Sequence, residues 1–253
     1  MCGETMARKR YPLPDTFRGV LLVAMMLYHL TWDLVHLHDV PWMWFLSDGA
    51  KVWQQIIAWS FVLLSGFCWP LGKSKWRRGL VVSAGGWIIT AVTLLVIPAE
   101  RVVFGVLTFL GAAMLAMIPL DKLLRHCNPV VGMLCSLACF VLLRNVSSGY
   151  LGFGMWNLLK LPEGWYANIV TTFFGFPTAA FFSRDYFPFL PWIFLFCTGY
   201  FMQKLFVRYH LNHVLTYGKC PPLEFLGRHS LIIYMVHQPI LYGICAAWFA
   251  VFG

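Results

Sequence analysis

The sequence predicts an all-α, polytopic integral membrane protein, a helical bundle of about seven transmembrane helices with one re-entrant or interfacial segment. Its 253 residues are 60% hydrophobic and 11% charged, whereas soluble domains are about half apolar and about a quarter charged. Apolar stretches long enough to cross a hydrocarbon core of ~30 Å recur along the chain. Because no internal repeat or second domain is recognisable, we expect one transmembrane domain, residues 1–253.

The charge and the cysteines exclude several classes of protein. The net charge of +9 does not indicate a nucleic-acid partner, because the basic residues cluster at segment ends, as the positive-inside rule requires. The eight cysteines contain no CxxC pair and predict small buried apolar residues, with no disulfide framework and no metal site. We expect no removable signal peptide, since the first apolar segment follows a basic N-terminus and lacks a small-residue cleavage site.

Seven apolar stretches are predicted to cross the membrane. They cover residues 15–37, 52–71, 79–97, 102–119, 129–145, 187–206 and 229–250. Basic residues precede the first crossing, at Arg8, Lys9 and Arg10, and follow every second crossing after that, in residues 73–78, at Lys122 and Arg125, and in residues 204–228. The positive-inside rule therefore predicts a multi-pass protein of the inner (plasma) membrane with a cytoplasmic N-terminus and an outer C-terminus.

Residues 166–182 are apolar, but we do not expect them to cross. Gly175 and Pro177 interrupt this stretch, and a full crossing would place the basic residues of 204–219 outside. We interpret it as a re-entrant or interfacial segment, and we expect the polar and aromatic residues 146–165 before it to face outward.

The first segment carries the most informative polar residues. Arg18 and His29 are eleven steps of ~100° apart, so both lie on one helix face, about 16 Å apart along the axis. His29 is then near the midplane, and Asp33 follows it by one turn on the same face. A carboxylate beside an imidazole fixes its tautomer and raises its basicity, which a general base needs. The alternative for Asp33 is an outer-end residue solvated by headgroups or water.

The last segment contributes His237, about nine residues into the helix and again near the midplane. Its alternative role is that of a hydrogen-bonded structural histidine. Tyr234, three residues earlier, is expected to complete the polar core. His36 and His38 follow the first segment on its outer side, where we expect interfacial positions or, for one of them, a position facing an acceptor.

Residues 73–78, with Lys75, Arg77 and Arg78, form the densest basic cluster. Together with Arg18, these side chains suit the phosphates of a cytoplasmic nucleotide such as coenzyme A, because arginine forks pair with phosphate oxygens. The alternative is topogenic, since positive-inside anchoring alone requires such a cluster. No glycine-rich phosphate loop is present.

Residues 15–19 (Asp-Thr-Phe-Arg-Gly), with His29 ten residues beyond Arg18, resemble the Arg-x10-His signature of acyltransferase-3 membrane proteins. The whole chain more closely resembles the bacterial branch of the heparan-α-glucosaminide N-acetyltransferase family, in the same transmembrane acyltransferase group. The further matching blocks are residues 61–66, 104–107, 185–192 and 225–239, which follow in the family's order.

This resemblance implies that acetyl-coenzyme A binds from the cytoplasm as acyl donor, without a metal. The acyl group would pass to an amino or hydroxyl group of an extracytoplasmic sugar or glycan. The resemblance also implies a catalytic histidine in or just after the first helix; in the eukaryotic enzymes it lies nearer to the position of His38, so His29 and His38 both remain candidates. The chain lacks the large luminal domain of those enzymes, so heparan itself is not implied.

The candidate substrate-binding residues are Arg184, Asp185 and Tyr186, at the start of the 185–192 block, and Tyr234. Membrane lipid is an expected partner, and a homo-oligomer is possible. The alternative function is a small membrane transporter or proton-coupled flippase, because buried histidine and aspartate also build proton relays. Transporters often show duplicated halves, and none is visible here.

Overall fold

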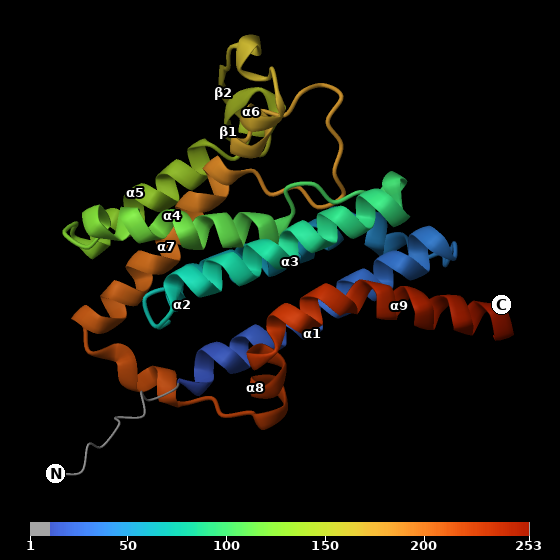
Figure 1. The fold of residues 1–253 in the computed structure, drawn as a ribbon, viewed down its shortest axis with the longest axis horizontal. Coiled ribbons are helices and arrows are strands. Elements are labelled where there is room, and N and C mark those ends of the chain that lie inside the picture. Colours follow the sequence, from blue (N-terminus) through green and yellow to red (C-terminus); the bar gives the residue numbers. More distant parts are fainter. Residues whose placement is uncertain (1–10, 253) are drawn as a thin grey trace. The chain divides into compact units, whose positions relative to one another are not determined.

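The computed structural model describes residues 11–252, which fold mainly as helices (Figure 1). The helices are α1 (Pro12–Leu37), α2 (Asp48–Cys68), α3 (Lys75–Val96), α4 (Val106–Leu124), α5 (Pro129–Leu142), α6 (Ile169–Phe174), α7 (Phe189–Arg208), α8 (Pro221–Arg228) and α9 (Ser230–Phe252). Two short strands, β1 (Tyr150–Phe153) and β2 (Trp156–Lys160), form an antiparallel hairpin. The predicted all-α membrane bundle is confirmed. The predicted cytoplasmic side of Arg8, Lys9 and Arg10 concerns residues outside the described part.

Within residues 11–252, six helices are long and apolar enough to cross a membrane. They are α1, α3, α4, the stretch 129–148 that contains α5, α7 and α9. The other predicted span, residues 52–71, corresponds to α2, which has 21 residues. Lys51, Gln54 and Gln55 in its first turns make it less apolar than the other six.

Residues 166–182 contain no helix long enough to cross a membrane, which agrees with the prediction. Their only helix is α6, with six residues, which span about 9 Å at ~1.5 Å per residue. Asn168 begins α6 with a capping box, in which its side chain accepts from Val170 and Thr171 while Thr171 bonds back to its backbone. The helix ends at Gly175, whose φ of +124° favours glycine.

The chain forms two compact units, each described here by itself. The terminal unit comprises Met1–Ile57 and Val207–Gly253, and the central unit comprises Ala58–Phe206. The prediction of a single domain stays a prediction.

In the central unit, helices approach closely at glycines. A Cβ on Gly66 would lie 1.9 Å from the carbonyl oxygen of Phe196, and one on Gly199 would lie 2.0 Å from that of Leu63. These contacts bring α2 and α7 together. Small residues of this kind are what allow helices to pack closely in membranes. In the same way, Gly86 and Gly111 bring α3 and α4 together.

In the terminal unit, α1 packs against α8 and α9. A Cβ on Gly19 would lie 2.1 Å from the carbonyl oxygen of Leu223, and one on Gly227 would lie 1.9 Å from that of Asp15. The backbones of α1 and α8 are therefore almost in contact. The α8 helix was not predicted from the sequence, because its eight residues begin with two prolines, include Glu224 and Arg228, and carry little hydrophobic signal.

Candidate functional site

Two histidines from opposite ends of the chain meet in the terminal unit. His29 of α1 and His237 of α9 lie edge to face, with their ring centroids 4.8 Å apart. His237 is buried. Tyr234 lies almost one turn earlier on α9, with its ring 5.4 Å from that of His237. Both histidines lie well inside long apolar helices, so the pair sits within the membrane-spanning part of the unit.

The hydrogen bonding of His237 defines its tautomer. Its Nδ1 lies 2.6 Å from the carbonyl oxygen of Tyr234. Because a carbonyl only accepts, Nδ1 carries the hydrogen, and in the neutral ring Nε2 is then the acceptor. Nε2 is buried and has no hydrogen-bond partner among the described residues. The site therefore presents an unused imidazole lone pair.

Asp33 is fully buried beside this pair, which does not fit the alternative of a headgroup-solvated residue. Its Oδ1 accepts a hydrogen bond from Nε2 of Gln238 at 2.8 Å. Its predicted hydrogen-bonding with His29 does not occur in the described structure, because α9 places the amide of Gln238 against the carboxylate. Oδ2 of Asp33 and Oε1 of Gln238 are both buried without a partner among residues 11–252.

Gln238 was not among the site residues predicted from the sequence. An amide carries no charge, so it gave no signal of the kind that marks an ionisable residue within an apolar span. Its position directly after His237 was the signal that could have identified it.

His38 contacts a part of α9 further toward the C-terminus than His29 does, and its charge acts on Asp33. It follows the last residue of α1 and stacks on Phe249 of α9, with ring centroids 4.0 Å apart and an interplanar angle of 7°. Phe249 comes twelve residues after His237, which is about 18 Å along a helix. Nε2 of His38 is buried and unpartnered within the described chain. His29 and His38 therefore contact α9 at two different residues, His237 and Phe249.

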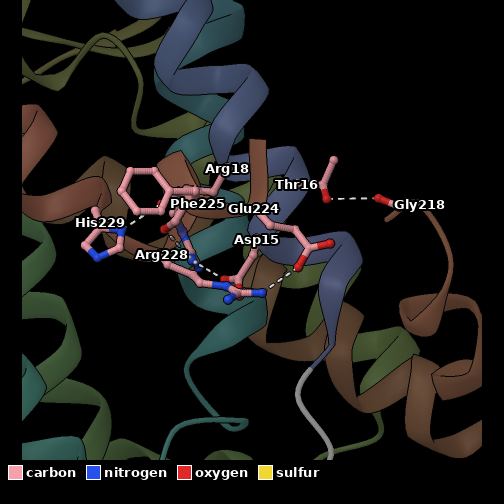
Figure 2. Close-up of polar contacts among 9 residues, drawn as sticks. Asp15, Thr16, Arg18, Gly218, Glu224, Phe225, Arg228 and His229 are labelled. Atoms are coloured by element: carbon pink, nitrogen blue, oxygen red, sulfur yellow. Dashed lines mark hydrogen bonds and ion pairs between the residues drawn. The ribbon is translucent and has the colours of Figure 1, made fainter. Parts of the chain in front are cut away.

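Arg18 belongs to a charged network between α1 and α8 (Figure 2). Its Nη1 donates to Oδ1 of Asp15 at 3.1 Å and to the carbonyl oxygen of Gly227 at 3.4 Å. Arg228 pairs with Glu224 at 2.6 Å and lies 3.9 Å from Asp15. Two guanidinium groups thus face two carboxylates, and the network ties α8 to the start of α1. Arg18 therefore has a structural role in this network, and a phosphate contact of its side chain stays a prediction.

The basic cluster of residues 73–78 lies in the central unit. Lys75 is 3.5 Å from Asp121 and stacks over the ring of Trp69 at 3.8 Å from its centroid. The guanidinium of Arg78 packs against Gly72, where a Cβ would be 1.6 Å from Nη1. Arg77 is exposed. Lys75 and Arg78 thus have structural contacts, and Arg77 is the most accessible member of the predicted phosphate site.

Arg184 and Asp185 hold the 183–187 segment against the connection between α3 and α4. Arg184 forms an ion pair with Glu100, and its backbone N–H donates to the carbonyl of Arg101 at 3.1 Å. Oδ2 of Asp185 accepts from the backbone N–H of Val106 at 2.9 Å, at the first residue of α4. Both contacts stabilise loops, and a substrate-binding role for these residues stays a prediction.

Tyr186, the third residue of this set, is also engaged in the fold. Its hydroxyl donates to the carbonyl oxygen of Thr172 in α6 at 2.5 Å. Burial raises the pKa of this phenol above its ordinary value, so it remains a neutral hydrogen-bond donor. The 183–187 segment is thereby tied to α6 as well as to α4.

Comparison with protein families gives one match. Residues 10–239 match the family model described as heparan-alpha-glucosaminide N-acetyltransferase, catalytic. The matched range covers most of the chain and includes His29, Asp33, His237 and Gln238. Comparisons with curated proteins and with solved structures found no match.

Proposed function

The chain belongs to the heparan-α-glucosaminide N-acetyltransferase family, and on that premise we propose the reaction that this membrane acetyltransferase catalyses. Acetyl-coenzyme A binds from the cytoplasm as the acyl donor. The acetyl group passes to an amino or hydroxyl group of an extracytoplasmic sugar or glycan. The observation that carries the proposal is the His29–His237 pair, in which His237 is buried and both rings lie inside long apolar helices.

In this proposal His29 acts as the general base. The acceptor nitrogen or oxygen attacks the thioester carbonyl, and His29 takes the proton that the nucleophile loses. The new C–N or C–O bond forms as the C–S bond breaks, and coenzyme A leaves as the thiol after its sulfur regains a proton. The ring of His237 lies beside this base, with centroids 4.8 Å apart, and its unpartnered Nε2 is an acceptor that the acceptor group or a water can use. General bases of this kind typically contribute about 10²–10⁴ in rate.

Asp33 and Gln238 are proposed to accept hydrogen bonds from the acceptor group of the substrate. A buried polar atom without a hydrogen bond destabilises a fold by about 1–3 kcal/mol. Asp33 Oδ2 and Gln238 Oε1 are two such atoms, and both are acceptors. A bound amine, hydroxyl or water that donates to them would remove this penalty.

The phosphates of coenzyme A are proposed to contact the basic residues Lys75, Arg77 and Arg78 of the central unit. A phosphate contact of Arg18, which belongs to the terminal unit, is a separate expectation. Arg77 is exposed, whereas Lys75 and Arg18 each have a carboxylate partner. We therefore expect Arg77 to contribute most of the phosphate binding.

The proposed orientation places the N-terminus in the cytoplasm, in the inner (plasma) membrane. If α2 crosses as well as the six more apolar helices, the basic residues of 73–78, 122–125 and 204–228 all lie on the N-terminal side. The same scheme puts the α3–α4 connection and the segment before α7 on one outer face. In support, the backbone N–H of Phe187 donates to the carbonyl of Phe104 at 2.9 Å.

Ligand-dependent thermal stability tests the proposal. A ligand that binds only the folded protein raises its stability by RT ln(1 + [L]/Kd). Acetyl-coenzyme A is expected to raise the unfolding temperature of the purified protein in detergent, whereas adenosine is not. The alternative is a transporter or flippase, in which buried histidines would relay protons. A protein that gains no stability from acetyl-coenzyme A, and that conducts protons when reconstituted in vesicles, would support this alternative.

A further inference from the structure

The β1–β2 hairpin of the central unit has an apolar tip. Phe153 and Trp156 pair directly across the two strands, and Gly154 and Met155 form the turn between them. Met155 is 94% exposed and Trp156 is 79% exposed. Large apolar side chains gathered at an exposed turn mark a surface that contacts something other than water.

Strand β2 is apolar on both faces. Leu158 and Leu159 are consecutive, so their side chains point to opposite sides of the strand, and they are 69% and 60% exposed. An antiparallel strand with one face on a core and the other in water alternates between apolar and polar residues. The pattern of β2 instead fits a strand that meets an apolar medium on each side.

A groove of about 420 Å³ lies between the hairpin and α5. Its walls include Leu134, Leu137 and Val141 of α5 and Phe153, Trp156 and Leu158 of the hairpin. The three α5 residues are exposed, and they belong to the stretch 129–148 that is long and apolar enough to span the membrane. The groove is therefore continuous with a lipid-facing helix surface.

The hairpin is fixed in place beside α5. Asn145, three residues after α5 ends, donates from Nδ2 to the carbonyl of Gly154 and to Oδ1 of Asn157, both at 2.9 Å. Gly152 allows the strands to approach, since a Cβ there would lie 1.9 Å from the carbonyl of Trp156 and its φ is +141°. The tip is thus held at the end of a membrane helix.

The base of the hairpin is polar. Tyr150 pairs with Lys160, and Lys160 forms an ion pair with Glu163 at 2.8 Å. Both side chains of this ion pair are more than half exposed. The hairpin therefore changes from charged at its base to apolar at its tip within five residues of β2.

We propose that this hairpin is a membrane anchor, whose tip enters the interface beside α5 and whose groove holds the acyl chains of bilayer phospholipids. Trp156 has the character of an interfacial aromatic residue. The depth is limited, because the outer edge of a two-stranded hairpin carries backbone groups that hydrocarbon cannot satisfy. The tip side chains consequently enter the acyl boundary while Lys160 and Glu163 stay in water. The proposal does not depend on the proposed reaction or on which side of the membrane α5 ends.

The test places one environment-sensitive fluorescent amino acid at position 155 or, as the matched control, at position 163. The full-length protein is reconstituted into phosphatidylcholine vesicles that contain lipid spin-labelled on the acyl chain. We expect the lipid label to quench the probe at 155 and aqueous iodide to quench the probe at 163. Adding Trp156→Asp to the first variant should weaken quenching by the lipid label and strengthen quenching by iodide.

Two results would overturn the anchor. If iodide quenches the probe at 155 as strongly as the probe at 163, the tip lies in water. If neither quencher reaches position 155 until the protein is diluted with excess lipid, a second copy of the chain covers the groove. Circular dichroism and an unchanged unfolding temperature would show that each variant is folded.

Discussion

At the scale of single residues, the site is defined by what surrounds His29. Its ring contacts His237, and the next turn of α1 carries Asp33, which is held by Gln238. These four side chains come from two helices of one unit. Arg18, eleven residues before His29, is about 16 Å away along α1, in the network with α8. The proposed chemistry and the α1–α8 contact are therefore separable by mutation.

The first prediction concerns the base. His29→Ala should reduce acyl transfer by about 10²–10⁴, the usual loss for a general base, and leave stabilisation by acetyl-coenzyme A in place. His237→Ala should also slow transfer, because the ring that contacts His29 is lost. Transfer of radiolabelled acetyl to glucosamine-type acceptors gives the rate. His38→Ala is the control: loss of transfer there, with near-normal transfer in His29→Ala, would assign the base to His38.

The second prediction concerns Gln238, which we expect to position Asp33. Gln238→Leu removes the only donor that the described structure gives to that carboxylate, so transfer should fall while acetyl-coenzyme A still binds. Asp33→Leu and the double variant complete a cycle that measures the coupling between the two side chains. Transfer rates in the double variant that equal the product of the two single effects would show that Gln238 and Asp33 act independently.

The third prediction concerns the donor. Arg77→Ala combined with Arg78→Ala should weaken acetyl-coenzyme A binding by roughly one to two decades, because the loss of one charge-assisted phosphate contact, which we expect mainly from Arg77, costs about 1.5–3 kcal/mol. Titration calorimetry measures the affinity. Lys160→Ala is the matched control, since it removes an exposed cation from the hairpin base. Equal affinities in the two variants would return the basic cluster to a purely topogenic role.

At the scale of elements, the close contact of α8 with α1 is the feature that supports the first turns of α1. α8 is too short to be stable alone, since isolated helices below about 12–15 residues are marginal in water. Its stability therefore depends on the glycine contacts with α1, on the hydrogen bond from Arg18 to the Gly227 carbonyl and on the ion pair of Arg228 with Asp15 (Figure 2).

The fourth prediction tests this dependence. Gly227→Ala should lower the unfolding temperature in detergent, because the new methyl group would overlap the backbone of Asp15 and force α8 away from α1. Gly243→Ala is the matched control on α9, where a Cβ meets nothing within 4 Å. That change should be neutral or stabilise by up to about 1 kcal/mol, the helix propensity difference between the two residues. Equal effects at both glycines would contradict the close α1–α8 contact.

Most long elements could be predicted from the sequence, and the short ones could not. Each of the seven predicted segments coincides with a helix to within a few residues, because an apolar run of this length has few alternatives. The α8 helix and the β1–β2 hairpin were missed, since eight and nine residues carry too little periodicity. The contact of Arg18 with the Gly227 carbonyl was missed for the same reason, because Gly227 lies on α8. The sequence predicted that His29 and His237 each lie near the midplane, but it did not predict that their rings are in contact.

At the scale of the whole molecule, the two units must each be consistent with one membrane topology. The α1–α8 network and the basic residues that precede α8 belong to one side, and in the central unit Lys75 and Asp121 pair across α3 and α4 on one side. The helix that decides the scheme is α2. It has the length of a span, and its last residues contact α7 through Gly66, yet its first turns are polar.

The fifth prediction is that α2 crosses the membrane, which makes seven spans with the N-terminus inside. A single cysteine at Lys73, in the exposed connection after α2, should resist a membrane-impermeant maleimide in intact cells and react after permeabilisation. A cysteine at Gly164, where a side chain meets nothing within 4 Å, should react in intact cells. The described native cysteines at positions 127 and 135 are exposed, so both variants are made in a chain in which cysteines are replaced by serine or alanine.

The physical reason for this expectation is the distribution of Lys and Arg. If α2 did not cross, residues 73–78 would lie opposite the basic N-terminal stretch, and the connections after α4 and α7 would change sides as well. Labelling of Lys73→Cys from outside would therefore show six spans, with α2 lying along the surface. It would also move the predicted coenzyme A contact at Arg77 away from the cytoplasm, so this one measurement bears on both the topology and the side from which the donor binds.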